Sequence, residues 1–112
     1  MDNKPLALKR LLSLLGLARK AGKLISGESA CENAFKKHEV KLAVVCADAS
    51  DNTKKKFSQK SYYYGCGYYE LLSKNELSGA IGLKNRAMFV ITDSGFGAKI
   101  ETMIKEMMIK EI

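Results

Sequence analysis

Several features on which metalloproteins, secreted proteins and many enzymes depend are scarce or absent in this 112-residue sequence. It has no tryptophan, one proline and one histidine. Its three cysteines, Cys31, Cys46 and Cys66, are odd in number and form neither a CxxC pair nor a Cys/His metal spacing. We therefore expect no metal site, no disulfide framework and a reducing compartment. Cys46 lies in an apolar run and is interpreted as a small core residue.

The sequence also lacks targeting and membrane signals. No basic-then-apolar leader with a cleavage site is present at the N-terminus, and no apolar run is long enough to span a bilayer. These absences predict a cytoplasmic protein without a membrane partner.

No set of catalytic side chains can be assembled. His38 stands near an expected helix end among charged residues, whereas a general base needs a partner and a pocket. Asp48 and Asp93 each follow an expected strand, but helix N-capping explains both. The Asp93–Gly97 turn has only part of a GxGxxG phosphate loop, because position 100 is Ile100. We expect a protein that is not an enzyme and has no cofactor. A small-ligand or nucleotide-binding α/β domain using this turn remains the alternative.

What the sequence does have is an excess of positive charge. Nineteen Lys and Arg residues stand against 12 Asp and Glu, a formal net charge of +7. Such a balance favours polyanionic partners. The hydrophobic fraction of 46% is ordinary for a globular protein, and the length predicts a single domain over residues 1–112. The alternative at this point is a basic protein that has no anionic partner.

Caps and apolar spacing predict five helices. Their expected starts and ends are Pro5 to about Lys20 with Gly22 just beyond, Ser26 or Gly27 to about His38, a helix capped within Asp48–Asp51, Ser73 to Gly82, and a last helix from Asp93–Gly95 onward. The second helix is expected to bury Ala30, Cys31, Ala34 and Phe35. The last carries an apolar stripe from Ile100 to Met108. If its Met103–Met108 face stayed exposed, a protein-interaction adaptor would be a third interpretation.

Four segments predict strands, and they alternate with these helices. They are Lys23–Ser26, Leu42–Ala47, Gly65–Tyr69 and Ala87–Thr92. The continuous apolar run of the second predicts a strand covered on both faces, and the glycines of the third predict an edge strand. The alternation predicts an α/β fold, a three-layer α/β/α sandwich around a four-stranded sheet.

Two basic loops are candidate binding sites. The Lys23–Ser29 turn leads from a strand into a helix, whose free N–H groups favour anions. The Ile81–Arg86 loop carries Lys84 and Arg86, and its Leu83 could rest against an unstacked base. Loops at one end of a sheet can converge and so form a composite phosphate-binding surface. The alternative for each loop is a solvated connection.

Two further patterns are interpreted structurally. The tyrosines of Tyr62–Tyr64 and Tyr68–Tyr69 could stack on single-stranded bases, but we favour the interpretation that some of them pack beside an edge strand, with their hydroxyls at the surface. The Lys54–Lys56 run is interpreted as a solvated helix face.

Three segments of the chain resemble a known family. ARKAGKLISGE, KLAVVCADASDNTKKKF and ELSGAIGLKNRAMFVITDSGFGAKI resemble the bacterial YlxQ-type proteins of the ribosomal L-seven-Ae / L-thirty-e superfamily of RNA-binding domains. The resemblance extends from about Leu11 to Ile100. It implies a mixed four-stranded sheet and binding to structured RNA, typically kink-turns. It also implies that the turn at Gly27 and the loop before the last strand form the RNA surface.

The sequence departs from the kink-turn signature of that superfamily, Gly-x-Asn-Glu-x-x-Lys. Gly27 is kept, but Ser29, Ala30 and Asn33 occupy the Asn, Glu and Lys positions. Serine lacks the paired donor and acceptor of an amide, and alanine offers neither. The resemblance therefore implies RNA binding in which a standard kink-turn is held more weakly.

The expected partner is structured RNA, with ribosomal RNA among the candidates, and we expect a monomer with no DNA partner. The candidate RNA-binding residues are Lys23, Gly27, Glu28, Ser29, Asn33, Lys37, Ile81, Gly82, Leu83, Lys84 and Arg86.

Overall fold

The computed structural model describes residues 5–109, in which helices and strands alternate strictly. The elements are α1 (Leu6–Lys20), β1 (Leu24–Ser26), α2 (Glu28–Lys36), β2 (Leu42–Val45), α3 (Asp51–Tyr64), β3 (Gly67–Glu70), α4 (Lys74–Ile81), β4 (Met88–Ile91) and α5 (Ser94–Ile109). The predicted order of elements is therefore confirmed.

The four strands form one mixed sheet in the order β1-β4-β2-β3. β4 runs antiparallel to both of its neighbours, whereas β2 and β3 are parallel. Every residue of β2 and β4 is buried, so both faces of the central strands are covered, as the apolar run at Leu42 predicted. β3 lies at one edge of the sheet, as predicted, and β1 lies at the other.

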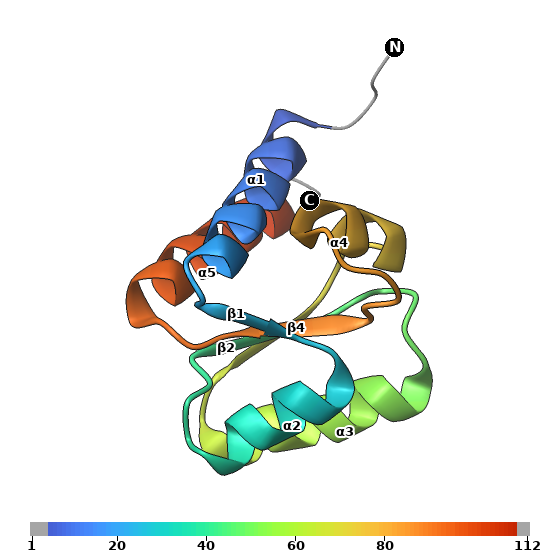
Figure 1. Cartoon of the computed structure of the whole chain (residues 1–112), viewed down its shortest axis with the longest axis vertical. Coiled ribbons are helices and arrows are strands. Elements are labelled where there is room, and N and C mark those ends of the chain that lie inside the picture. Colours follow the sequence, from blue (N-terminus) through green and yellow to red (C-terminus); the bar gives the residue numbers. More distant parts are fainter. Residues whose placement is uncertain (1–4, 110–112) are drawn as a thin grey trace.

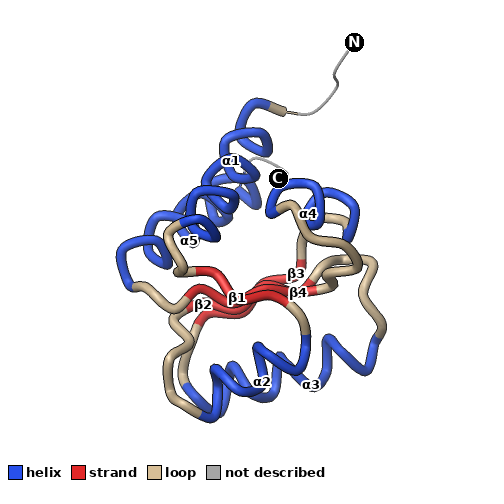
Figure 2. Tube along the Cα trace, viewed as in Figure 1, coloured by secondary structure: helices blue, strands red, loops and turns tan. Residues whose placement is uncertain are grey.

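Helices cover both faces of the sheet. α1, α4 and α5 lie on one side, and α2 and α3 lie on the other (Figures 1 and 2). On the first side, α1 and α4 approach closely at Gly16, where an added Cβ would lie 3.0 Å from the carbonyl oxygen of Ala80. The arrangement is the predicted three-layer α/β/α sandwich.

The helix ends follow from local side-chain chemistry. The Ser50 hydroxyl accepts a hydrogen bond from the Thr53 backbone N–H at 3.2 Å and caps α3. Ser73 and Glu76 form the predicted capping box of α4. Gly82 ends α4 in a left-handed conformation, as predicted.

Several helix and strand boundaries differ from the sequence prediction. Gly65 was expected to begin a strand, but it takes φ +73° and ends α3 after Tyr64. α2 ends at Lys36 rather than at His38, whose φ is +58°. The second strand ends at Val45, because the N–H of Ala47 donates to the carbonyl of Leu72, away from the ladder. The first and last strands likewise begin one residue late, and the last also ends one residue early.

The core joins the buried faces of the helices to the sheet. Cys31, Ala34 and Phe35 of α2 are buried as predicted, but Ala30 is exposed, so its place in the predicted apolar face is wrong. At about 100° per residue, the buried stripe of α2 runs from Ala34 through Cys31 to Phe35, and Ala30 lies about 40° beyond Ala34, at its margin. Cys46 is buried, as predicted.

The tyrosines divide into two groups. Tyr68 and Tyr69 of β3 are partly buried, and their hydroxyls donate to Glu70 and Glu101 at 2.7 and 2.8 Å. These two behave as predicted. Tyr62 and Tyr63 are 90% and 81% exposed on α3, so they are not among the tyrosines that pack against the core. Both lie on the side of the helix away from Phe57, which is buried.

Candidate functional site

The two predicted basic loops meet at one end of the sheet. Arg86, which precedes β4, donates from Nε to the hydroxyl of Ser26 at the end of β1, at 3.0 Å. Its Nη1 donates to the carbonyl of Lys84 at 2.9 Å. The antiparallel register pairs Ser26 with Phe89, so the loop after β1 and the loop before β4 lie at the same end of the sheet. The predicted convergence is therefore present.

Gly27 forms the corner of this junction. Its φ of +91° lies in a region that favours glycine, and its N–H donates to the carbonyl of Met88 at 3.2 Å. A Cβ there would lie 3.9 Å from Cδ and Nε of Arg86. As the N-cap of α2, Gly27 supplies no side-chain cap. The first N–H groups of α2 therefore stay available to an anion beside the Arg86 side chain.

The exposed face of α2 continues this surface. Ser29, Ala30 and Asn33, the three signature positions, lie together along α2 and are exposed. With Glu32 and Lys36 they line a shallow groove of about 460 Å³. The groove offers a hydroxyl, an amide and a lysine to a ligand.

Glu28 points elsewhere. Its carboxylate accepts a hydrogen bond from the Thr53 hydroxyl at 3.1 Å, and that hydroxyl is 2.9 Å from the hydroxyl of Ser50. Thr53 is buried. The Glu28 side chain thus connects the start of α2 to the start of α3 within the protein.

The predicted residues of the second loop differ in exposure. Ile81 is 3% exposed and belongs to the core, and Leu83 is partly buried against the core. Gly82 and Lys84 are exposed. Ile81 and Leu83 therefore anchor the loop, while Lys84 projects from it toward solvent.

Two predicted residues lie away from the junction. The carbonyl of Lys23 accepts a hydrogen bond from the N–H of Thr92, which follows β4, whereas Arg86 precedes β4. Lys37 is the C-cap of α2, at the opposite end of a nine-residue helix from Gly27. At 1.5 Å per residue this separation is about 15 Å. The structure does not bring Lys23 and Lys37 to the junction between Gly27 and Arg86.

The groups weighed for catalysis or nucleotide binding have structural contacts. Asp93 Oδ2 accepts a hydrogen bond from the N–H of Phe96 at 2.8 Å, so its carboxylate occupies the start of α5. Asp48 is the N-cap of neither α3 nor α4, whose caps are Ser50 and Ser73, but its Oδ1 accepts a hydrogen bond from the N–H of Lys74, the first residue of α4, at 3.0 Å. His38 is exposed, and its ring meets Tyr64 edge-on at a centroid distance of 5.2 Å.

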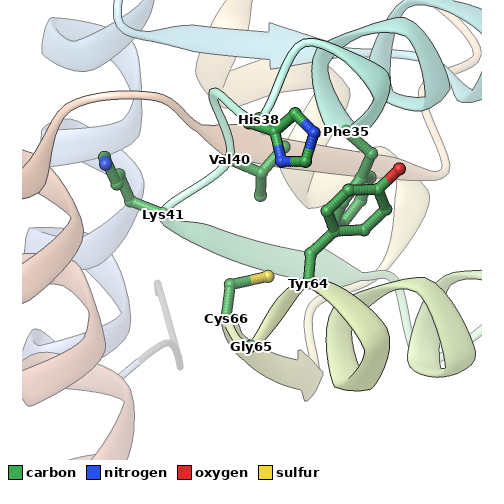
Figure 3. A pocket seen from close by; sticks show the side chains of 7 residues that line it. All are labelled: Phe35, His38, Val40, Lys41, Tyr64, Gly65 and Cys66. Carbon is green, nitrogen blue, oxygen red and sulfur yellow. The ribbon is translucent and has the colours of Figure 1, made fainter.

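A cavity of about 290 Å³ lies beside that ring pair, lined by residues that include Val40, Lys41 and Cys66 (Figure 3). The Lys41 side chain points away from His38 and Tyr64. Burial raises the pKa of the Cys66 thiol, which disfavours the thiolate that a nucleophile or metal ligand requires. This cavity therefore does not assemble a reactive group.

Within residues 5–109, no three or more His, Cys, Asp and Glu side chains gather in a way that could hold a metal ion. None of the helices in this range has the length and apolar character needed to cross a membrane.

Comparison with known proteins places these features in context. The model of the ribosomal protein L7Ae/L30e/S12e/Gadd45 family matches residues 9–101. A protein of Enterococcus faecium named RNA-binding protein YlxQ is 41% identical over 97 residues, covering 87% of this chain and 93% of the relative. The protein of the same name from Bacillus subtilis is 36% identical over 91 residues, covering 81% and 91%.

Solved structures agree with the fold. A Bacillus halodurans protein of unknown function superposes with a TM-score of 0.82 at 33% identity, over 86% of this chain and 97% of the other. The Giardia lamblia 15.5kD RNA binding protein superposes with a TM-score of 0.73 over 95% and 96%. At 16% identity, this second likeness concerns the fold alone.

Proposed function

The chain belongs to the ribosomal protein L7Ae/L30e/S12e/Gadd45 family, and from this premise we propose that it is a non-catalytic protein that binds structured RNA. The observation that carries the proposal is the junction of the Gly27 turn with the Lys84–Arg86 loop. It sets a guanidinium beside the uncapped start of α2. Two relatives that bear the name RNA-binding protein support the same conclusion.

The proposed interface consists of the α2 start, Ser29, Asn33, Lys84 and Arg86. The N–H groups and cations would hold phosphates, while the hydroxyl and amide on α2 would contact base edges. Glu28 supports this interface through Thr53 rather than by touching RNA.

The proposal extends to the class of RNA, the oligomeric state and the location of the protein in the cell. Structured RNA of the ribosome, including kink-turns, is the proposed target class, with a standard kink-turn held less tightly because of Ser29, Ala30 and Asn33. We further propose a monomer that acts in the cytoplasm as one RNA-binding domain, with no DNA partner.

The experiment is a salt titration of binding to a structured RNA that contains a helical stem. The logarithm of the association constant should fall with the logarithm of salt concentration by about 0.9 for each phosphate contact on a duplex, with duplex DNA as the reference. The double variant Lys84→Ala/Arg86→Ala should bind more weakly and lose about two units of that slope.

The matched control is Lys99→Ala/Lys105→Ala, which removes the same charge from α5 on the other face of the sheet. It should keep most of the affinity. A slope indistinguishable from zero for the unaltered protein would refute RNA binding through phosphates. Equal losses in the two double variants would show that net charge, not the junction, governs binding.

A further inference from the structure

A second basic surface lies between α2 and α3. Lys36 of α2 and Lys56 and Lys60 of α3 surround the carboxylate of Glu32, which forms an ion pair with Lys56. The hydrogen bond from Lys56, together with the charges of the other two lysines, lowers the pKa of Glu32. The carboxylate of Glu28 also acts on Lys56, so these three cations face two carboxylates and still leave an excess of positive charge. We call Lys36, Lys56, Lys60 and Tyr63 the α2–α3 surface.

Tyr63 gives this surface an exposed aromatic ring. Its side chain is 81% exposed, and its ring meets Tyr64 edge-on at 5.0 Å between centroids. Tyr64 is in turn held by Phe35 at 5.5 Å and by His38 at 5.2 Å, the group drawn in Figure 3. Tyr63 therefore contacts a ring that is itself packed against the protein. This contact restricts the Tyr63 side chain and so reduces the conformational entropy that it would lose when a ligand stacks on it.

The α2–α3 surface is continuous with the proposed RNA interface. A groove of about 370 Å³ on α3 is lined by Lys56, Lys60 and Tyr63 among others. The Glu32–Lys56 ion pair joins it to the α2 groove that contains Ser29. α2 and α3 lie side by side on one face of the sheet (Figure 1). A chain leaving the start of α2 can follow the helices to Tyr63.

We propose that the α2–α3 surface binds a single-stranded RNA segment that flanks the structured element, with a base stacked on Tyr63 and phosphates on Lys36, Lys56 and Lys60. This inference rests on the proposed function, since the structured element is held at the Gly27–Arg86 junction. Lysines combined with an exposed ring are the features that bind single strands without sequence preference. A purely acidic peptide would use the lysines but would leave the ring without a partner.

The experiment compares one structured RNA with and without a tail of about eight uridines, a length within the range of single-strand binding sites. The tail should raise the affinity of the unaltered protein. Tyr63→Ala should lower the affinity for the tailed RNA at least about five-fold, which is the low end of the effect expected when one base loses its stacking on an aromatic side chain. It should leave the affinity for the tailless RNA unchanged. Tyr63→Phe, which keeps the ring, should bind as the unaltered protein does.

Tyr62→Ala is the matched control. Tyr62 is the preceding residue and is 90% exposed, but it lies about 100° around α3 and does not line the groove. Its loss should leave the gain from the tail intact. Because both tyrosines are exposed, neither variant should change the unfolding midpoint, which is measured in parallel.

The outcomes separate the two proposals. If the tailless RNA binds but the tail adds nothing, or if Tyr62→Ala and Tyr63→Ala lose equally, the α2–α3 proposal is overturned and the proposed function stands. If neither RNA binds, both fall. If polyglutamate of matched charge displaces the tail as effectively as unlabelled oligouridine does, the surface recognises acidic charge, and the stacking proposal is overturned.

Discussion

The guanidinium of Arg86 and the hydroxyl of Ser26 are joined by a hydrogen bond of 3.0 Å across 60 positions of the sequence. The bond ties the last residue of β1 to the loop before β4. It holds a cation beside the uncapped start of α2, so the geometry of the candidate site depends on two segments that are remote along the chain.

Ser26→Ala should therefore weaken RNA binding without removing any charge. The Arg86 side chain would lose an anchor, and we expect a loss of about 1 kcal/mol in binding, the net value of a typical hydrogen bond. Arg86→Ala should cost more. Because the residues act together, the double variant should bind no worse than Arg86→Ala alone, a coupling that a double-mutant cycle measures. Strict additivity would contradict this dependence.

Gly27→Ala should destabilise the fold by about 1–3 kcal/mol, since φ +91° strains any residue with a Cβ. An added Cβ would make only ordinary van der Waals contact with Arg86 at 3.9 Å, so the cost comes from the backbone and not from a clash. Unfolding in denaturant gives the value, and the affinity of the folded protein should fall as well.

Gly79→Ala is the control for that substitution. Gly79 lies within α4 with nothing within 4 Å of an added Cβ, so alanine there should stabilise the protein by about 0.5–1 kcal/mol. If Gly27→Ala were as stable as the unaltered protein, the conformation at the corner would not require glycine.

Restoring the signature with Ser29→Asn, Ala30→Glu and Asn33→Lys should raise the affinity for a standard kink-turn. All three positions are exposed on α2, so the triple variant should fold normally. Contacts to base edges are worth about 1–3 kcal/mol each in DNA complexes, and we take that scale as a guide. Titration against a kink-turn and a plain duplex is the measurement. Kink-turn binding by the unaltered protein as tight as by the triple variant would show that the signature residues are dispensable here.

The cysteines should differ in reactivity. Burial raises the pKa of Cys31 to about 12 and that of Cys46 to about 12, and both are almost inaccessible. At pH 8 an alkylating reagent should modify the half-buried Cys66 first and the other two only in denaturant, because the thiolate is the nucleophile. Mass spectrometry of timed samples checks the order. Rapid labelling of Cys31 in the native protein would contradict the burial of its side chain beneath α2.

A raised thiol pKa also predicts how stability depends on pH. In the unfolded chain these thiols lose their protons near the ordinary cysteine pKa of 9.0, whereas in the folded protein their pKa is about 12. The contribution of the two thiols to the free energy of unfolding is therefore complete below pH 9 and declines as the pH rises toward 12. Cys31→Ala should therefore show a shallower loss of unfolding free energy over that range, measured by denaturant titration at each pH.

Much of the fold was predictable because its signals are local. The capping box at Ser73, the left-handed Gly82 and the buried run at Leu42 each depend on residues a few positions apart. The sequence pattern does not show which of the five tyrosines pack against the core. Gly65 is predicted to begin a strand, whereas in the structure it ends α3, and this helix leaves Tyr62 and Tyr63 exposed.

The sequence by itself determined the alternation of helices and strands, the helix caps, the buried central strand and the family. Hydrophobic periodicity and turn-forming residues are features of short sequence segments, so they can be recognised without the tertiary structure. Only the tertiary structure decided that Arg86 donates a hydrogen bond to Ser26 and that Glu28 accepts one from Thr53. It also decided that Lys23 lies at the end of the sheet opposite to Arg86. These relations depend on strand order and register, which bring together residues dozens of positions apart. No local pattern encodes that proximity, because it comes from packing the whole sheet between its two layers of helices.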